Sequence, residues 1–226
     1  MRQMTEPLRI FIGFDERQTV AFQVCAQSVW EHASKPVSIT RLDLRTLPIK
    51  RMGLTAFTYS RFLAPYLSNF EGYSLFLDSD ILMRHDPYRF EIVASQHPEI
   101  DFMYVEDKTR LFERPSMMFF KNSSFTHLTP EFVEREKMFD FAWLEGKGAW
   151  KLDKDWNHLV GYDAPNPDAK IVHYTMGIPV WDETKHCEFA KEWWETFQRM
   201  NSTVSFNELM GRSVHVPHLE KLKANA

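Results

Sequence analysis

Short apolar runs alternate along this chain with segments of helical periodicity, and no other feature of the sequence constrains the fold as strongly. The runs at 8–14, 73–78 and 100–105 are almost wholly apolar, which is typical of strands buried on both faces of a parallel sheet. Between the first two, residues 16–34 repeat apolar side chains every three or four positions, which predicts an amphipathic helix. Alternating strands and helices predict an α/β fold with a mixed, mostly parallel sheet flanked by helices.

The remaining elements are expected to continue this order. Further strands are predicted at 36–44, 116–122 and 170–175, and further helices at 59–70, 130–144 and 182–200. The helix at 59–70 should break or kink at Pro65. Because the 226 residues include no linker rich in Gly, Ser or Pro, we expect a single domain over 1–226, with flexible ends at 1–7 and 215–226.

Composition and charge disfavour several classes of protein. A formal net charge of −4 argues against nonspecific nucleic-acid binding, which needs a basic surface. No apolar run approaches the length of a membrane span, and the first residues lack the apolar segment of a signal peptide. Cys25 and Cys187 are expected to be free thiols, as in a reducing compartment. We therefore expect a cytoplasmic protein, and we interpret the basic run at 218–226 as a solvated tail, with peripheral membrane contact as the alternative.

Two carboxylates lie where the apolar run at 73–78 ends: Asp78 is its last residue, and Asp80 follows two residues later. On an extended backbone, side chains two residues apart point to the same side, so both can reach one cation. Hard oxygen ligands suit Mg²⁺, Mn²⁺ or Ca²⁺. The alternative is that the pair caps a loop or binds Arg84, whereas Asp86 lies too far along the chain to be counted on as a ligand. In an open α/β sheet, ligands bind at the carboxyl ends of the strands, where Asp15 also falls.

His173 ends another apolar strand and precedes a turn that contains Gly177 and Pro179. Alone, such a histidine is more often a structural residue than a ligand. Together with Asp78 and Asp80 it predicts a site of two carboxylates and one imidazole, which shifts the expected metal toward Mn²⁺. The sequence contains no phosphate-binding loop, no G-x-G-x-x-G and no nucleophile elbow.

Four segments, taken in order, resemble glycosyltransferase family 8, a family of retaining enzymes with the GT-A fold. They read GFDERQTVAFQVCAQSV, YSRFLAPYL, LFLDSDILMRHD and HYTMGIPVW, and the resemblance covers roughly residues 8 to 200. They resemble, respectively, the family's first strand with its acidic nucleotide contact and helix, its arginine-bearing helix, its metal motif and its late histidine segment. The resemblance implies a GT-A-type, Rossmann-like α/β domain that acts as a hexosyltransferase.

The same resemblance implies a nucleotide-diphosphate sugar, expected to be a UDP-sugar, held by a divalent metal. It makes Asp78, Asp80 and His173 the metal ligands, with Mn²⁺ expected and Mg²⁺ as the alternative. The donor-binding residues that it implies are Gly13, Phe14, Asp15, Arg61, Asp78, Ser79 and Gly177. On the acceptor side we expect Trp156 and Asn157, which resemble the family's Trp-Asn segment, and Trp181, whose flat face suits a sugar ring.

The family's Asp-Gln-Asp motif has no counterpart here, and Glu145 or Asp153 are the candidates for the polar group that it places beside the anomeric carbon. Our leading interpretation is a metal-dependent glycosyltransferase that moves a sugar, with retention, onto a glycan, lipid-linked or other hydroxyl acceptor. One alternative is a GT-A module that binds a nucleotide sugar or glycan without turnover, which the missing motif favours. Another is a metal-dependent phosphohydrolase.

Overall fold

The computed structural model describes residues 6–202 and, beyond them, 204, 208, 209, 211, 214, 217, 218 and 221. The predicted flexible ends, 1–7 and 215–226, lie for the most part outside these residues. No helix among the described residues is both long enough and apolar enough to cross a bilayer.

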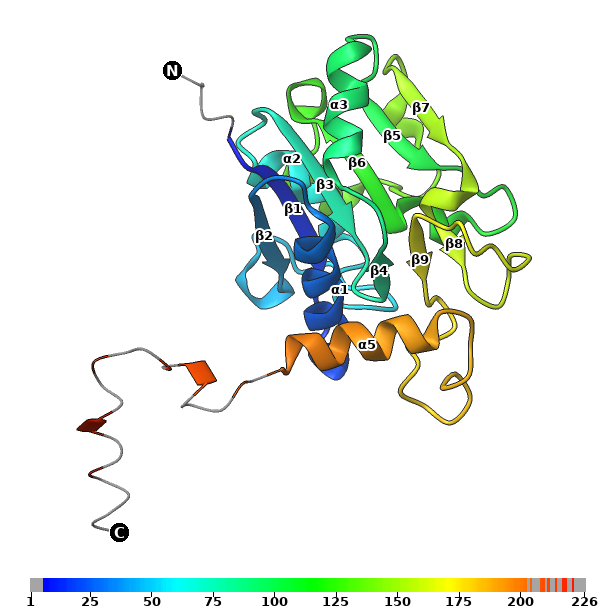
Figure 1. The fold of residues 1–226 in the computed structure, drawn as a ribbon. Coiled ribbons are helices and arrows are strands. Elements are labelled where there is room, and N and C mark those ends of the chain that lie inside the picture. Colours follow the sequence, from blue (N-terminus) through cyan, green and yellow to red (C-terminus); the bar gives the residue numbers. More distant parts are fainter. Residues whose placement is uncertain are drawn as a thin grey trace.

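A six-stranded mixed sheet forms the centre of the fold, in the order β2-β1-β3-β6-β5-β7 (Figure 1). Its strands are β1 (Leu8–Gly13), β2 (Val37–Leu42), β3 (Tyr73–Leu77), β5 (Phe102–Val105), β6 (Met117–Lys121) and β7 (Ala149–Leu152). The pairs β1/β2, β1/β3 and β5/β7 are parallel, whereas β6 runs antiparallel to both of its neighbours. The predicted α/β class with a mostly parallel sheet is confirmed.

A second, smaller sheet joins the main one at the end of β3. It contains β4 (Ile81–Met83), β9 (Ile171–His173) and β8 (His158–Leu159), with β9 in the middle. Strand β4 pairs antiparallel with β9, in a register that sets Ile81 opposite His173. This pairing carries the chain after β3 directly to the end of β9.

Helices cover both faces of the main sheet. They are α1 (Thr19–His32), α2 (Ala64–Leu67), α3 (Tyr88–Gln96), α4 (Pro130–Arg135) and α5 (Ala190–Met200). Along β1, side chains alternate between the faces: Ile10 and Ile12 join a core with residues of α1 and α3, whereas Phe11 joins an aromatic core with Phe62 of the segment leading into α2. Helix α5 packs beside α1 and the small sheet (Figure 1), with Trp193 buried between them.

Several predicted elements are shorter than expected. The helix predicted at 182–200 begins only at Ala190, because Phe189 has a left-handed backbone and residues 182–188 are not helical. Cys187 therefore lies outside a helix; both cysteines are free. The helix predicted at 130–144 ends at Arg135, and the following turns bury Phe141 and Trp143 in the aromatic core. The break predicted at Pro65 is present: a 3₁₀ turn over Ser60–Leu63 leads into α2.

Candidate functional site

Three predicted ligands meet where β3 and β9 end. Asp78 follows β3, and its backbone N–H donates to the carbonyl of Ser116 at 2.8 Å. The carbonyl of Asp80 accepts from the backbone N–H of Tyr174 at 2.9 Å, which continues the β4/β9 pairing. As a result, one ligand atom from each of Asp78, Asp80 and His173 lies within 4.8 Å of the other two.

Two carboxylate oxygens of this cluster lack the hydrogen bonds that buried carboxylates normally accept. Among the described residues, Oδ1 of Asp78 and Oδ1 of Asp80 are buried and accept no hydrogen bond. His173 Nε2 lies 3.4 Å from Asp80 Oδ1. Buried polar atoms without a partner are rare and call for an explanation, and a divalent cation between these three groups supplies one. The residues present therefore fit a metal of the kind that the sequence predicts.

Arg61, and not Arg84, pairs with the cluster. The Arg61 Nη1 atom lies 3.1 Å from Oδ1 of Asp78 and donates to Oδ2 at 3.3 Å. Arg84 instead pairs with Glu192 on α5 at 2.7 Å, so the alternative that the aspartates bind Arg84 is wrong. The Nε–H of Arg61 is buried and donates to none of the described residues, which leaves one donor of this guanidinium for a ligand.

The negative charge of the carboxylates in this cluster is only partly compensated. Burial raises the pKa of Asp78 to about 7, against the lowering effect of the positive charge on Arg61. Burial lowers the pKa of His173, but the negative charge of Asp80, with those of Glu113 and Asp78, outweighs burial and raises that pKa to about 9. Both shifts show that this group of residues stabilises added positive charge.

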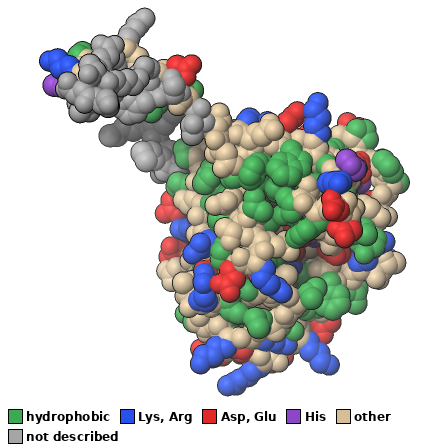
Figure 2. Space-filling model, turned by 90° about the horizontal axis from the view of Figure 1, so that it is seen from below, with side chains coloured by type: hydrophobic (Ala, Val, Ile, Leu, Met, Phe, Trp, Pro, Cys, Tyr) green, Lys and Arg blue, Asp and Glu red, His purple; other side chains and the backbone are tan. Residues whose placement is uncertain are grey.

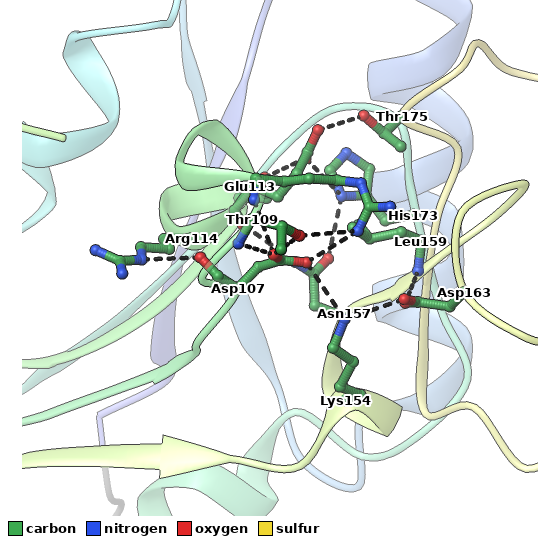
Figure 3. A network of polar contacts seen from close by, with 12 residues as sticks. Asp107, Thr109, Glu113, Arg114, Lys154, Asn157, Leu159, Asp163, His173 and Thr175 are labelled. Carbon is green, nitrogen blue, oxygen red and sulfur yellow. Dashed lines mark hydrogen bonds and ion pairs between the residues drawn. The ribbon is translucent and has the colours of Figure 1, made fainter.

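Asn157 orients the imidazole (Figure 3). Its Nδ2 donates to the carbonyl of Glu113 at 3.2 Å, so its Oδ1 is the atom that faces His173 Nδ1 at 3.1 Å. In the neutral imidazole that would bind a metal, this contact favours hydrogen on Nδ1 and leaves the lone pair of Nε2 on the side of Asp80. Metal-binding histidines are commonly held in this way by a second group. The structure thus places Asn157, which we expected on the acceptor side, behind His173.

Glu113 is a carboxylate of this site that the sequence analysis missed. Its Oε1 accepts from Thr175 Oγ1 at 2.6 Å, and its Oε2 lies 3.6 Å from His173 Nδ1 (Figure 3). Glu113 comes from the 3₁₀ segment Leu111–Ser116 that leads into β6. Because β6 is antiparallel to β3, with Met117 opposite Leu77, the residues before β6 lie beside the residues after β3. Recognising β6 as antiparallel was the one signal that could have revealed Glu113.

The cluster lies in a cavity of about 890 Å³ that we call the central cleft. Six of the predicted residues line it: Arg61, Asp78, Asp80, His173, Gly177 and Trp181. Gly177 has φ +118°, and a Cβ atom there would lie 2.9 Å from the Trp181 ring, so only glycine fits. Leu54, Phe112 and Met176 also line the cleft and are largely exposed. Figure 2, viewed from below Figure 1 on the side where β1 ends, shows hydrophobic side chains gathered near the middle of this face.

A neighbouring cavity of about 650 Å³ contains Phe14 and Asp15, and Arg17 lines both cavities. The Asp15 carboxylate is fully engaged: it accepts from Arg17 Nε at 2.8 Å, from Arg17 Nη2 at 2.6 Å and from the backbone N–H of Ala56 at 3.2 Å. The hydrogen bond from the Arg17 side chain lowers the pKa of Asp15 to about 2. Of the other predicted donor residues, Ser79 is buried, and a side chain at Gly13 would meet the Phe57 ring.

Three predicted residues lie away from the central cleft. Glu145 is exposed in the turn that follows Trp143. Asp153 and Trp156 line a third cavity, of about 570 Å³, between α3 and β7. The Trp156 ring is buried against Phe90, with ring centroids 4.7 Å apart. The structure therefore does not bring Glu145, Asp153 or Trp156 to the lining that contains the predicted metal ligands.

Comparison with known proteins gives similarity in sequence and in structure. No family model matches the chain. Protein CDI of Arabidopsis thaliana is 29% identical over 233 residues, which covers 87% of this chain and 88% of that protein.

Solved structures of glycosyltransferases resemble the chain more in fold than in sequence. The apo structure of the bifunctional glycosyltransferase WbbM superposes with a TM-score of 0.64 at 14% identity, over 94% of this chain and 53% of WbbM. An active-site mutant of LgtC gives 0.58 at 11% identity, over 89% of this chain and 99% of LgtC. GlyE of Streptococcus pneumoniae TIGR4 gives 0.58 at 16% identity, over 85% of this chain and 60% of GlyE. The chain thus spans about half of WbbM and most of LgtC, and its fold is that of the GT-A glycosyltransferases.

Proposed function

We propose that this protein is a metal-dependent glycosyltransferase related to family 8, which transfers a hexose from a nucleotide-diphosphate sugar, with retention, to a hydroxyl acceptor. The observation that carries the proposal is the pair of buried Oδ1 atoms on Asp78 and Asp80, beside His173, which accept no hydrogen bond from the described residues at the strand ends of a GT-A fold. Mn²⁺ is the metal we propose, because imidazole joins the two carboxylates, and UDP is the nucleotide.

The chemistry requires stabilisation of a diphosphate leaving group, whose negative charge grows as the sugar–phosphate bond breaks. A divalent metal held by Asp78, Asp80 and His173 would supply that stabilisation as a Lewis acid. Arg61, in the lining of the cleft, would offer the donor its Nε–H, which donates to none of the described residues. Gly177, which lines the cleft without a side chain, lets the donor approach the backbone closely.

The sugar requires a polar group beside its anomeric carbon, and we assign this position to Glu113. Among the described residues that line the central cleft, Asp78, Asp80 and Glu113 are the only carboxylates. With the two aspartates engaged as metal ligands, Glu113 is left to face the sugar, held by Thr175 at 2.6 Å. Glu145 and Asp153, our expectations from the sequence, do not line this cleft.

The proposal covers a wider range of acceptors than of donors. Trp181 lines the cleft beside Gly177 and offers a face to an acceptor sugar. The exposed apolar residues Leu54, Phe112 and Met176 would also tolerate a lipid-linked acceptor. We further propose a cytoplasmic location for one domain spanning 1–226, since both free cysteines suit a reducing compartment.

A second candidate function is a GT-A module that binds a nucleotide sugar without turnover. It is favoured by the absence of an Asp-Gln-Asp motif and by the distance of Glu145 and Asp153 from the cleft lining. Both candidates share a donor site, so donor binding and transfer have to be measured separately.

A thermal-shift screen of nucleotide sugars with and without Mn²⁺ tests the donor site. A ligand at a hundred times its dissociation constant adds about 2.7 kcal/mol to the free energy of unfolding. We expect this shift with one nucleotide sugar in Mn²⁺, its loss in Asp80→Ala, and its retention in the control Asp182→Ala, whose side chain is 91% exposed on the surface. Absence of any shift in either metal condition would overturn the donor site. Transfer to an acceptor then separates the enzyme from the binding module.

A further inference from the structure

The cavity between α3 and β7, which we call the α3–β7 cavity, has no part in the function proposed above. It measures about 570 Å³ and is lined by residues of α3 and of β7, the edge strand of the main sheet. Its lining includes Asp153 and Trp156, two residues that the sequence analysis selected and the central cleft does not use. The cavity is therefore a second concave site with its own chemistry.

Basic groups dominate the lining. His85, Arg89, His97 and Lys170 face one carboxylate, that of Asp153. Two of these groups already have partners outside the lining: His97 contacts Glu99 at 3.1 Å, and Lys170 contacts Asp155 at 3.5 Å. In contrast, none of the described residues forms an ion pair or a side-chain hydrogen bond with Arg89. The lining thus holds an exposed guanidinium without an anionic partner among the described residues, and a guanidinium binds carboxylate or phosphate with two parallel hydrogen bonds.

An exposed aromatic face completes the lining. Trp150 is 45% exposed on β7, although the large aromatic side chains of the neighbouring strand β5 are buried. The His97 ring lies beside it, with centroids 5.9 Å apart. Much of this indole still faces solvent, and flat apolar faces suit the C–H surface of a pyranose ring. A stacking surface next to an unpaired guanidinium is complementary to a sugar that carries an anionic group.

The back wall of this cavity belongs to the segments that hold the predicted metal ligand. Trp156 forms part of the wall, and the next residue, Asn157, contacts His173 in the central cleft. Lys170 lies three residues before His173 on the approach to β9, which corresponds to about 10 Å along an extended strand. Adjacent residues of one segment thus reach both sites, although the two linings share no residue.

We propose that the α3–β7 cavity is a carbohydrate site for an anionic sugar residue, which stacks on Trp150 and pairs with Arg89. In the setting of the proposed function, on which this part rests, the site anchors an acidic residue of the acceptor glycan. Binding to the cavity itself requires neither the metal nor the donor, and this independence separates the two proposals in experiment.

Isothermal titration calorimetry in the absence of Mn²⁺ tests the site with three probes: a glucuronate-containing disaccharide, glucose 6-phosphate and the neutral disaccharide cellobiose. We expect an anionic probe to bind at least tenfold more tightly than cellobiose. Arg89→Ala and Trp150→Ala should each weaken that binding about tenfold or more, and Trp150→Phe should retain most of it. Preference between the two anionic probes shows whether the site takes a carboxylate or a phosphate.

Matched controls come from similar side chains elsewhere on the surface. Trp30→Ala removes a tryptophan that is 55% exposed on α1, and Lys191→Ala removes a cation that is 90% exposed on α5. Both should bind like the unmodified protein, as should Asp80→Ala, which disables only the central cleft. The proposal would be overturned if Arg89→Ala and Trp150→Ala bound the anionic probe as tightly as the unmodified protein does. It would also be overturned if Asp80→Ala lost this binding, or if neither anionic probe bound. If the donor screen fails while these results hold, the carbohydrate site stands without the transferase.

Discussion

Asp15 and Asp78 occupy equivalent places in the fold, yet the protein treats them in opposite ways. Asp78 directly follows β3, and Asp15 follows the neighbouring parallel strand β1 after one residue, Phe14. The Asp15 carboxylate accepts hydrogen bonds from Nε and Nη2 of Arg17 and from backbone N–H groups, and its pKa falls to about 2. Asp78 keeps a buried Oδ1 that accepts no hydrogen bond from the part of the chain that the structure describes, and burial raises its pKa to about 7.

The difference separates a carboxylate that structures a loop from one that has an oxygen atom left to bind a ligand. A turn with the pattern of Asp15 recurs after β2, where Asp43 accepts from the backbone and side chain of Arg45 and begins another 3₁₀ turn. This repetition indicates that the Asp-x-Arg turn is a local folding device. Position at a strand end is thus insufficient to identify a ligand, and the number of unsatisfied oxygens is the better guide.

The largest effect is expected from Glu113→Gln. This substitution tests whether the cluster around Asp78 contains a catalytic carboxylate as well as metal ligands. Glutamine keeps the size of the side chain and an acceptor for Thr175, but it removes the negative charge. We expect kcat to fall roughly 100-fold while donor affinity changes little, because the charge acts on the transition state. Steady-state kinetics and calorimetry measure the two quantities.

The control for this prediction is Glu106→Gln, since Glu106 pairs with Lys151 and does not line the central cleft. Unchanged kcat in Glu113→Gln would remove Glu113 from the reaction. A parallel loss of metal affinity would make it a positioning residue for His173 instead.

Asn157→Ala should weaken Mn²⁺ binding by about tenfold or more, because loss of a group that orients a ligand typically costs that much affinity. The alanine leaves His173 Nδ1 without the contact at 3.1 Å that sets its tautomer. Asn157→Asp restores an oxygen acceptor at that position and should recover most of the affinity. Mn²⁺ titration by calorimetry measures the effect.

Asn166→Ala is the control for Asn157→Ala. Asn166 lies in the neighbouring loop, where it contacts Asp155 and Glu188 but none of the predicted metal ligands. Equal Mn²⁺ affinity in Asn157→Ala and the unmodified protein would show that Asn157 does not orient the ligand.

The comparison also explains how far the sequence alone could lead. Asp78, Asp80 and His173 each follow or end a recognisable apolar strand, so their convergence could be predicted from the rule on strand ends. Glu113 has no such marker, because its place depends on the antiparallel direction of β6. The direction of a strand relative to its neighbours depends on the whole sheet and cannot be read from the local sequence pattern.

Exposure and contacts between distant segments account for the other misses. Strand β7 was not recognised because its residues are mostly exposed and show no apolar run. Asn157 could be located by its motif, but its contact with His173 arises only when β8 pairs with β9. The position of Trp156 in a separate cavity likewise depends on α3, which the sequence analysis did not identify.

Asp15→Ala should lower the free energy of unfolding by about 1–2 kcal/mol, because it removes the cap of the first 3₁₀ turn and leaves the N–H groups of Arg17 and Ala56 without an acceptor. Mn²⁺ affinity should stay within about twofold, since Asp15 does not line the central cleft. Urea denaturation and Mn²⁺ titration measure the two effects. A large loss of Mn²⁺ affinity would mean that the two aspartates form one coupled site, contrary to the comparison.

The smallest expected effect is a dependence on pH that belongs to Asp15. Its pKa is about 2 in the folded protein against an ordinary value of 3.8, so its ionised form stabilises the fold above pH 3.8, and this contribution disappears as the pH falls toward 2. Because Arg17 is largely exposed and solvent screens the pair, we expect only about 1 kcal/mol. The measurement is the difference in unfolding free energy between the unmodified protein and Asp15→Asn, which should be constant near neutral pH and should shrink between pH 4 and 2. Asp43 and the other carboxylates titrate equally in both proteins, so their contributions cancel in this difference. A difference that stays constant over that interval would show that the Arg17 pair does not stabilise the fold, and Asp15 would then be as free for a ligand as Asp78.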